Sequence, residues 1–381
     1  MPEWYPWPET PSLGSWAVEH ARLVADGHEV VVLAAAPGRV RRWEWTQCHE
    51  RGLRTVRLRY RDPGVPYSAF PFRLAGSLSV LNHLRRSGFI PEVIHAHVFQ
   101  AGLVALALGG RAGVPVVVSE HWSRLRRGQL PPLPRLLART VYRRADMVCP
   151  VSDDLGTFIR SLGVRSPVRR VPNAVDTARF HPPAAPLEEE PPRLLHVGGL
   201  VEVKAQATLF DAFARFVAEH AGAQLDVVGD GPLRQPLGAR ARALGLEGQI
   251  TFHGALGADQ VAQRMRSAHL FVLSSEFESA PHVLLEAMAS GLPSVATDVG
   301  GISEIVDEES GVLAPPGSAP DLAAAIATAW KRRKTFVAER LARRARERFG
   351  RVKVAQEWSE VYEEVIAAVR ASSRTSSAGP G

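Results

Sequence analysis

The chain has 381 residues, of which 45% are hydrophobic and 22% charged, a balance typical of globular proteins with two or three domains. Its two cysteines, Cys48 and Cys149, exclude a disulfide scaffold and have no metal-ligand spacing, so we expect free thiols in a reducing compartment. The net charge of +7 is uneven, because residues 1–185 carry 25 arginines against 14 acidic residues and the remainder is net −4. The basic half predicts either an anionic partner or a solvated arginine-rich surface.

The sequence predicts neither a signal peptide nor a membrane span. The opening MPEWYPWPETPSLG lacks a basic start and an apolar core, and the apolar run 101–110 is too short to cross a bilayer. We therefore expect a cytoplasmic protein. Six of the eight tryptophans and the basic segment 124–146 predict a surface that faces the inner side of the membrane or binds the acceptor. An ordinary amphipathic surface helix beside a packed core is the alternative.

In the first half, short apolar strands alternate with helical stretches. Residues 15–27 predict an amphipathic helix that ends at Gly27. Strands are expected at 29–33, 54–58, 92–97, 114–121, 146–152 and 168–173. Apolar strands joined by helices are typical of parallel sheets covered on both faces, so residues 1–183 are predicted to form a Rossmann-like domain.

A linker rich in Pro and Glu, near 180–192, precedes a second series of the same kind. Its expected strands lie in LLHVGG, QLDVVGDG, QITFHG, HLFVLSSE, PSVATDVGG and GVLAPP. We predict a second Rossmann-like domain over 193–348, an α/β architecture of two doubly wound domains facing across a cleft, and a disordered tail at 372–381. Ligands of such sheets bind at the carboxyl ends of the strands.

Glycines follow two strands of the second domain. Gly198 in HVGG and Gly229 in VGDG would let backbone N–H groups approach a phosphate, although every α/β protein has such turns. Lys204, the first lysine in the chain, would neutralise a diphosphate or be an ordinary solvated lysine. Spacing alone leaves both interpretations open.

Two glutamates, Glu278 and Glu286, flank the start of a predicted helix, HVLLEAMAS. Pro281 suits the first turn and Gly291 the end of that helix. An anion would contact the N–H groups of His282 and Val283, and the two carboxylates would accept hydrogen bonds from hydroxyls on either side. This describes a nucleotide sugar, but a helix-capping glutamate and a buried structural glutamate would give the same sequence.

The segment SSEFESAPHVLLEAMASGLPSVATDVGG resembles the donor-site signature of the retaining family-4 glycosyltransferases, also called group 1. Further segments agree in order, among them LVADGHEVVVL, VIHAH, VPVVVSEHW, VPNAVDTARF, HVGGL and VVGDGPL. The resemblance covers about residues 4–365 and includes a branch that makes bacterial polysaccharides. It implies the GT-B fold, no metal or other cofactor, and a helix at 349–371 that crosses back to the first domain.

The resemblance also implies roles for individual residues. Glu286 would hold the ribose hydroxyls, Glu278 the hydroxyls of the donor sugar, and Lys204 the diphosphate together with the N–H groups of His282 and Val283. Gly14 would let the first domain approach the phosphates or the acceptor, and His121 would lie near the transferred sugar. The loop behind the donor would consist of Gly300, Gly301 and Glu304. His97 is interpreted as a structural strand-end histidine and Asn173 as a turn residue.

The sequence departs from the family pattern in two places. Gly199 stands where the family usually has the arginine that is paired with Lys204, and Ala205 replaces a glycine. Relatives also place a strand before the segment EWYPWPE, and its absence would leave strand edges unpaired.

The function implied is a retaining glycosyltransferase that moves a sugar from a UDP- or GDP-type donor to a glycan or lipid-linked acceptor. The acceptor hydroxyl would attack from the face that the diphosphate leaves, and the protein would stabilise the charge on the leaving group. Because of Gly199, a catalytically weak or inactive sugar-nucleotide-binding protein is the alternative. A sugar-nucleotide epimerase fits the glutamate signature poorly, and no aromatic-basic motif supports nucleic-acid binding.

Overall fold

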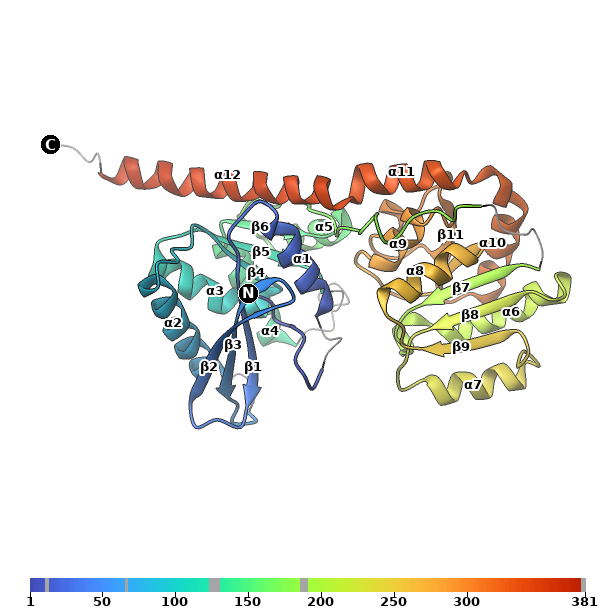
Figure 1. The fold of residues 1–381 in the computed structure, drawn as a ribbon, viewed down its shortest axis with the longest axis horizontal. Coiled ribbons are helices and arrows are strands. Elements are labelled where there is room, and N and C mark those ends of the chain that lie inside the picture. Colours follow the sequence, from blue (N-terminus) through green and yellow to red (C-terminus); the bar gives the residue numbers. More distant parts are fainter. Residues whose placement is uncertain (11–13, 66–67, 123–130, 186–190, 378–381) are drawn as a thin grey trace. The chain divides into compact units, whose positions relative to one another are not determined.

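The structure, a computed structural model, describes residues 1–381 except 11–13, 66–67, 123–130, 186–190 and 378–381. The chain forms two compact units, each an α/β assembly (Figure 1). Unit 1 comprises Met1–Val171 and Ala355–Gly381, and unit 2 comprises Pro172–Val354. The last stretch of the chain therefore packs with the first.

Unit 1 has two three-stranded sheets, in the orders β1-β3-β2 and β4-β5-β6. Its strands are β1 (Val31–Gly38), β2 (Trp43–Glu50), β3 (Leu53–Arg61), β4 (Ile94–His97), β5 (Val116–Glu120) and β6 (Met147–Pro150). Its helices are α1 (Ser15–Ala25), α2 (Phe70–Arg86), α3 (Phe99–Ala112), α4 (Pro132–Arg144), α5 (Asp153–Ser161) and α12 (Arg351–Ser377), the last of which begins in unit 2.

The strands of unit 1 differ from the predicted ones in two places. Strand β2 was missed because WEWTQCHE is largely exposed and lacks an apolar run, and it pairs antiparallel with β3. The predicted strand at 168–173 makes only a single bridge, Val148 to Val168. The expectation of a purely parallel first sheet is therefore wrong.

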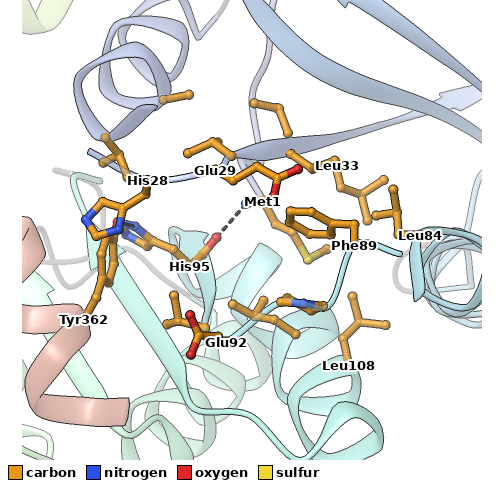
Figure 2. A pocket seen from close by; sticks show the side chains of 18 of the residues that line it. Met1, His28, Glu29, Leu33, Leu84, Phe89, Glu92, His95, Leu108 and Tyr362 are labelled. Atoms are coloured by element: carbon orange, nitrogen blue, oxygen red, sulfur yellow. Dashed lines mark hydrogen bonds between the residues drawn. The ribbon is translucent and has the colours of Figure 1, made fainter. Parts of the chain in front are cut away.

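A cavity of about 810 Å³ separates the two sheets of unit 1 (Figure 2). Its walls include Leu33 of β1 and His95 of β4, with Phe89 and Tyr362 beside them. The amino group of Met1 donates to the carbonyl of His95 at 2.5 Å. Within the described residues, strands β1 and β4 are each the outermost strand of their sheet on the side of the cavity, apart from the bridge between Pro2 and His97.

Unit 2 is a doubly wound domain with one six-stranded parallel sheet, ordered β12-β11-β10-β7-β8-β9. The strands are β7 (Arg193–Val197), β8 (Gln224–Val228), β9 (Ile250–Gly254), β10 (Leu270–Leu273), β11 (Ser294–Thr297) and β12 (Gly311–Ala314). The α-helices are α6 (Gln206–Glu219), α7 (Arg234–Ala243), α8 (Ala258–Ser267), α9 (His282–Ala289), α10 (Ala319–Arg332) and α11 (Ala338–Phe349). All six predicted strands of this half are confirmed.

The two faces of this sheet carry separate apolar cores. Strand β10 supplies both, because Phe271 belongs to the cluster under α8, α9 and α11, and Val272 to the cluster under α6, α7 and α10. This alternation is the consequence of side chains that point to opposite faces along a strand. The sheet is thus covered on both sides, and its ligand-binding capacity is confined to its ends.

The C-terminal helix is longer than the sequence predicted. Helix α12 runs to Ser377, so residues 372–377 are helical where a disordered tail was expected. Tyr362 donates to or accepts from the Nδ1 atom of His95 at 2.8 Å, and Arg169 contacts Glu360 at 2.5 Å, which fixes α12 to unit 1. Among the described residues, no helix is both long and apolar enough to cross a membrane.

The tryptophan- and arginine-rich part of unit 1 is only partly described. Residues 123–130 of the basic segment lie outside the described residues. Helix α4 packs against α3, and its residues Ala138, Val141 and Tyr142 are buried. Trp7 is buried, with the guanidinium of Arg59 centred 3.8 Å from its ring. A membrane contact of this half stays a prediction.

Close packing of backbones in unit 2 predicts a specific sensitivity to side chains at Gly229. Gly229 has φ 136°, and a Cβ atom there would lie 2.0 Å from the carbonyl oxygen of Gly198. Gly245 also has a positive φ, 70°, but a Cβ atom would meet nothing within 4 Å. We expect Gly245→Ala to lower the free energy of unfolding by about 1 kcal/mol and Gly229→Ala to lower it by clearly more. Urea denaturation of both variants measures this, and equal losses would contradict the packing described.

Candidate functional site

The carboxyl ends of β7 and β10 place two loops side by side, because these strands are neighbours in the sheet. The first loop, 198–205, includes the short turn Glu202–Lys204, and the second loop is 274–281. The N–H group of Glu276 donates to the carbonyl of Val203 at 2.9 Å, and the Ser274 hydroxyl donates to the carbonyl of Lys204 at 2.8 Å. These hydrogen bonds fix the two loops to each other.

An ion pair joins the same two loops. The Lys204 ammonium lies 2.5 Å from Oε1 of Glu278, and the Ser275 hydroxyl donates to the same oxygen at 2.7 Å. The side chains of Lys204 and Glu278 are only 20% and 12% exposed, so water screens the pair weakly. Two residues 74 positions apart in sequence thus form one charged cluster at the carboxyl end of the parallel sheet.

Helix α9 begins beside this cluster. Its N-cap residue is Pro281 with no side-chain cap, so the first N–H groups of the helix, at His282 and Val283, lack intrahelical acceptors and produce a site suited to an anion. Burial lowers the pKa of His282 to about 4, which leaves its ring neutral. The helix therefore supplies N–H groups and a dipole at this place, without a charged imidazole.

Glu286 lies one turn into α9 and is half-buried. Burial raises the pKa of its carboxyl to about 7, against the opposing effect of Arg179. No hydrogen-bond donor contacts this carboxyl group among the described residues. The carboxyl can therefore accept hydrogen bonds from a ligand.

Glycines form the remaining edge of the site. Leu200 N donates to the carbonyl of Asp230 at 3.0 Å, and Gly198 N donates to Val228 at 3.0 Å, so the loops after β7 and β8 are in backbone contact. Gly300 has φ 57° and precedes Gly301, the N-cap of the short turn Ile302–Glu304. The structure thus places Gly198 and Gly229 together and puts Gly300, Gly301 and Glu304 in the loop after β11.

Two predicted residues, Gly14 and His121, belong to unit 1. Gly14 is the N-cap of α1 with φ 74°, and a Cβ atom there would lie 2.3 Å from the carbonyl oxygen of Trp4. His121 follows β5, and its Nε2 atom lies 3.3 Å from Nδ1 of His97. His97, interpreted from the sequence as structural, is buried and directly contacts the predicted site residue.

Three histidines of unit 1 come close enough to hold a metal ion. Single ring nitrogens of His20, His95 and His97 lie within 4.8 Å of one another. Both nitrogens of His95 already have hydroxyl partners, Tyr362 at 2.8 Å and Ser119 at 2.6 Å. These two hydroxyl contacts disfavour a metal ion at the three histidines. That no metal is needed stays a prediction.

The chain matches two family models that meet at residues 178–179. "Glycosyltransferase Family 4" matches residues 19–179, and "Glycosyl transferases group 1" matches residues 178–348. The glycosyltransferase EpsF of Bacillus subtilis (strain 168) is 32% identical over 288 residues, which are 69% of this chain and 73% of that protein. The chain belongs to the group 1 glycosyltransferases.

Solved structures place this glycosyltransferase in the GT-B fold. Sucrose-phosphate synthase from Thermosynechococcus elongatus superimposes with a TM-score of 0.76 at 20% identity, covering 94% of this chain and 95% of that chain. Anabaena HepE, solved in complex with UDP-glucose, has a TM-score of 0.67 at 22% identity and covers 80% and 86% of the two chains. The predicted fold and family are both confirmed.

Sequence reasoning missed several residues that support the glycosyltransferase site. Gln206 is buried and donates to the carbonyl of Gly199 at 2.8 Å, and Thr297 donates to the carbonyl of Ser275 at 2.5 Å. Both lie beside sheet-end loops, but only the spatial order of the strands shows which loops they hold. Ser275, which precedes Glu278 by three positions, was readable as a local hydrogen-bond partner.

The raised pKa of Glu286 predicts a pH dependence of stability. Because this pKa rises from 4.5 to about 7 on folding, the stabilisation linked to it is fully present below about pH 4.5 and is lost as the pH rises through 7. Glu286→Gln removes the titration, so relative to the parent it should gain about 1–2 kcal/mol of unfolding free energy between pH 5 and pH 8. Urea denaturation at both pH values measures the difference. The exposed control Glu308→Gln should show no such gain. If the unfolding free energy of Glu286→Gln differs from that of the parent equally at pH 5 and pH 8, the raised pKa of Glu286 is refuted.

Proposed function

We propose that this glycosyltransferase transfers a sugar from a UDP- or GDP-type donor, with retention of the anomeric configuration. We further propose a glycan or lipid-linked acceptor in polysaccharide or glycoconjugate synthesis, acting in the cytoplasm. The observation that supports this donor is the Lys204–Glu278 pair at the uncapped start of α9. This place offers a cation, N–H groups and carboxylates at the carboxyl end of the parallel sheet. The structure of HepE in complex with UDP-glucose supports this class of donor.

In this proposal, different groups of unit 2 contact the diphosphate, the ribose and the sugar of the donor. The diphosphate lies at the start of α9, where the N–H groups of His282 and Val283 and the ammonium of Lys204 meet its charge. Glu286 accepts from the ribose hydroxyls, and Glu278 accepts from hydroxyls of the sugar. Lys204 is paired with Glu278 before the donor binds, so its charge is already aimed at this place.

The proposed chemistry needs no protein nucleophile. As the bond from the anomeric carbon to the diphosphate oxygen breaks, the acceptor hydroxyl oxygen bonds to the same face of that carbon. Its proton passes to the departing phosphate oxygen, so the products are the glycoside and the nucleoside diphosphate. The protein contributes by stabilising the charge that grows on the diphosphate, through Lys204 and the helix. The roles of His121 and Gly14 toward the sugar and phosphates remain part of this proposal.

Gly199 supports a second candidate, a weak transferase or a sugar-nucleotide-binding protein. Gly199 is exposed, and a Cβ atom there would meet only the carbonyl oxygen of Asp230, at 3.9 Å. An arginine would therefore fit without backbone strain, yet the chain has none at this position. In this proposal, Lys204 and the start of α9 supply the positive charge at the diphosphate.

A panel of UDP-, GDP- and dTDP-sugars tests the donor assignment. We expect one nucleotide to bind and to be released during transfer, and Glu286→Ala to weaken its binding by at least tenfold because the ribose hydroxyls lose their acceptor. Titration calorimetry measures binding, and Glu308→Ala is the exposed control. Failure of the folded protein to bind any member of the panel would refute the donor class, whereas binding without transfer would favour the binding protein.

Restoring charge at position 199 separates the two candidates. Gly199→Arg should raise kcat by about 10- to 100-fold if the missing charge limits departure of the diphosphate. Gly199→Ala, which adds a side chain without charge, should leave kcat unchanged. An unchanged kcat in Gly199→Arg would mean that Lys204 and the helix suffice.

A further inference from the structure

A fully buried carboxylate, Glu120, ends strand β5 of unit 1. Its Oε1 atom accepts from the N–H groups of His121 at 3.0 Å and Trp122 at 2.8 Å. Its Oε2 atom accepts from the N–H group of Phe99 at 3.2 Å and from the hydroxyl of Tyr142 at 2.5 Å. Burial raises the pKa of Glu120 to about 7, whereas these four hydrogen bonds favour its ionised form. A carboxylate so enclosed cannot touch a substrate, so its function must be exerted through the groups it holds.

The three backbone N–H groups among them follow two different strands, at the carboxyl end of the β4-β5-β6 sheet. Phe99 is the first residue of α3, immediately after strand β4, and His121 and Trp122 follow β5. Strands β4 and β5 are neighbours, so one side chain can reach both loops. Glu120 is therefore a bridge between segments that are 21 positions apart in sequence.

The first of these loops is strained. Val98 has φ 63° and ψ 154°, a conformation that β-branched residues avoid at a cost of about 1–3 kcal/mol. The turn is held on both sides, because Val98 N donates to the carbonyl of Ser119 at 2.8 Å and Phe99 N donates to Glu120. Such strain persists only where the surroundings fix it, and strained residues cluster at functional sites.

The strained turn and the segment after β5 carry the two imidazoles in contact. His97 directly precedes Val98, and its Nδ1 atom lies 3.3 Å from Nε2 of His121. Burial lowers the pKa of His97 well below its ordinary value, so its ring is neutral and has one N–H donor. The indole of Trp16 packs 4.4 Å from the His121 ring, centroid to centroid. The orientation of His121 thus depends on both loops.

We propose that Glu120 is a positioning residue for transfer, which fixes the orientation and tautomer of His121 by tying its backbone to the turn that carries His97. This inference rests on the proposed function only in that His121 serves the transferred sugar. Tyr142 completes the arrangement from α4 by donating to the second oxygen. Glu120 acts on kcat and leaves the nucleotide site of unit 2 untouched.

A double-mutant cycle tests the proposal. In Glu120→Gln the side chain keeps one acceptor oxygen and gains an NH₂ group, so one of the two loops loses its acceptor. We expect kcat to fall about 10- to 100-fold with nucleotide affinity unchanged, and no further fall when Glu120→Gln is added to His121→Ala. Ser77→Ala, which removes a buried polar group elsewhere in unit 1, is the control and should not change kcat. An equal fall in both backgrounds, or none in either, would overturn the proposal; should Glu120→Gln not fold, the cycle with Tyr142→Phe decides.

A readout without turnover distinguishes this inference from the proposed function. Imidazole nitrogen NMR of the folded protein reports the tautomers of His97 and His121. In Glu120→Gln we expect the His121 signals to move to a mixture of tautomers while signals from His196, in unit 2, stay in place. Unchanged His121 signals would overturn the positioning role even if transfer is observed, and changed signals would support it even if every donor fails.

Discussion

The ion pair between Lys204 and Glu278 is the interaction on which the candidate site depends. It unites the loops after β7 and β10, and the Ser275 hydroxyl and the backbone contact of Glu276 with Val203 hold the same loops in register. A lysine placed there without its partner would be drawn toward water, and a carboxylate without the lysine would repel a diphosphate. Together they bring opposite charges to the start of a helix whose N–H groups have no side-chain cap.

Both units of the chain have glutamates on the carboxyl side of a parallel sheet, but for different purposes. In unit 2, Glu278 and Glu286 retain access to a ligand, because neither is enclosed by donors on all sides. In unit 1, Glu120 is enclosed and accepts hydrogen bonds from backbone N–H groups and a tyrosine hydroxyl. The contrast shows how burial and the number of donors decide whether a carboxyl group serves a ligand or the protein.

Much of unit 2 was predictable from the sequence, because each of its six strands is a short apolar run that ends in a loop former. The ligand-facing residues were also predictable in kind, since the long segment from Ser274 to Gly301 specifies a family. What the sequence did not show is which loops touch. Lys204 contacts Glu278 because β10 and β7 are neighbours in the sheet, which no local pattern reveals. The hydrogen bonds from Gln206 and Thr297 to these loops also depend on the order of the strands.

Unit 1 was less predictable for physical reasons. Strand β2 carries polar side chains on both faces and pairs antiparallel, so the apolar run that marks the other strands is missing. Glu120 and Val98 gave no signal, since a buried carboxylate looks like a surface glutamate in sequence and a strained valine looks like any strand residue. The extension of α12 through Ser377 was hidden by a composition of Ser, Thr and Arg that is typical of disordered tails.

The central claim is that a nucleoside diphosphate binds where the loops after β7 and β10 meet the start of α9. Hydrogen–deuterium exchange of the whole protein, with and without UDP or GDP, tests it most directly. The account predicts slower exchange for the amides of 198–204 and 276–286 with the nucleotide that binds, and loss of that protection in Lys204→Ala. Protection confined to unit 1, with these loops unchanged, would contradict it.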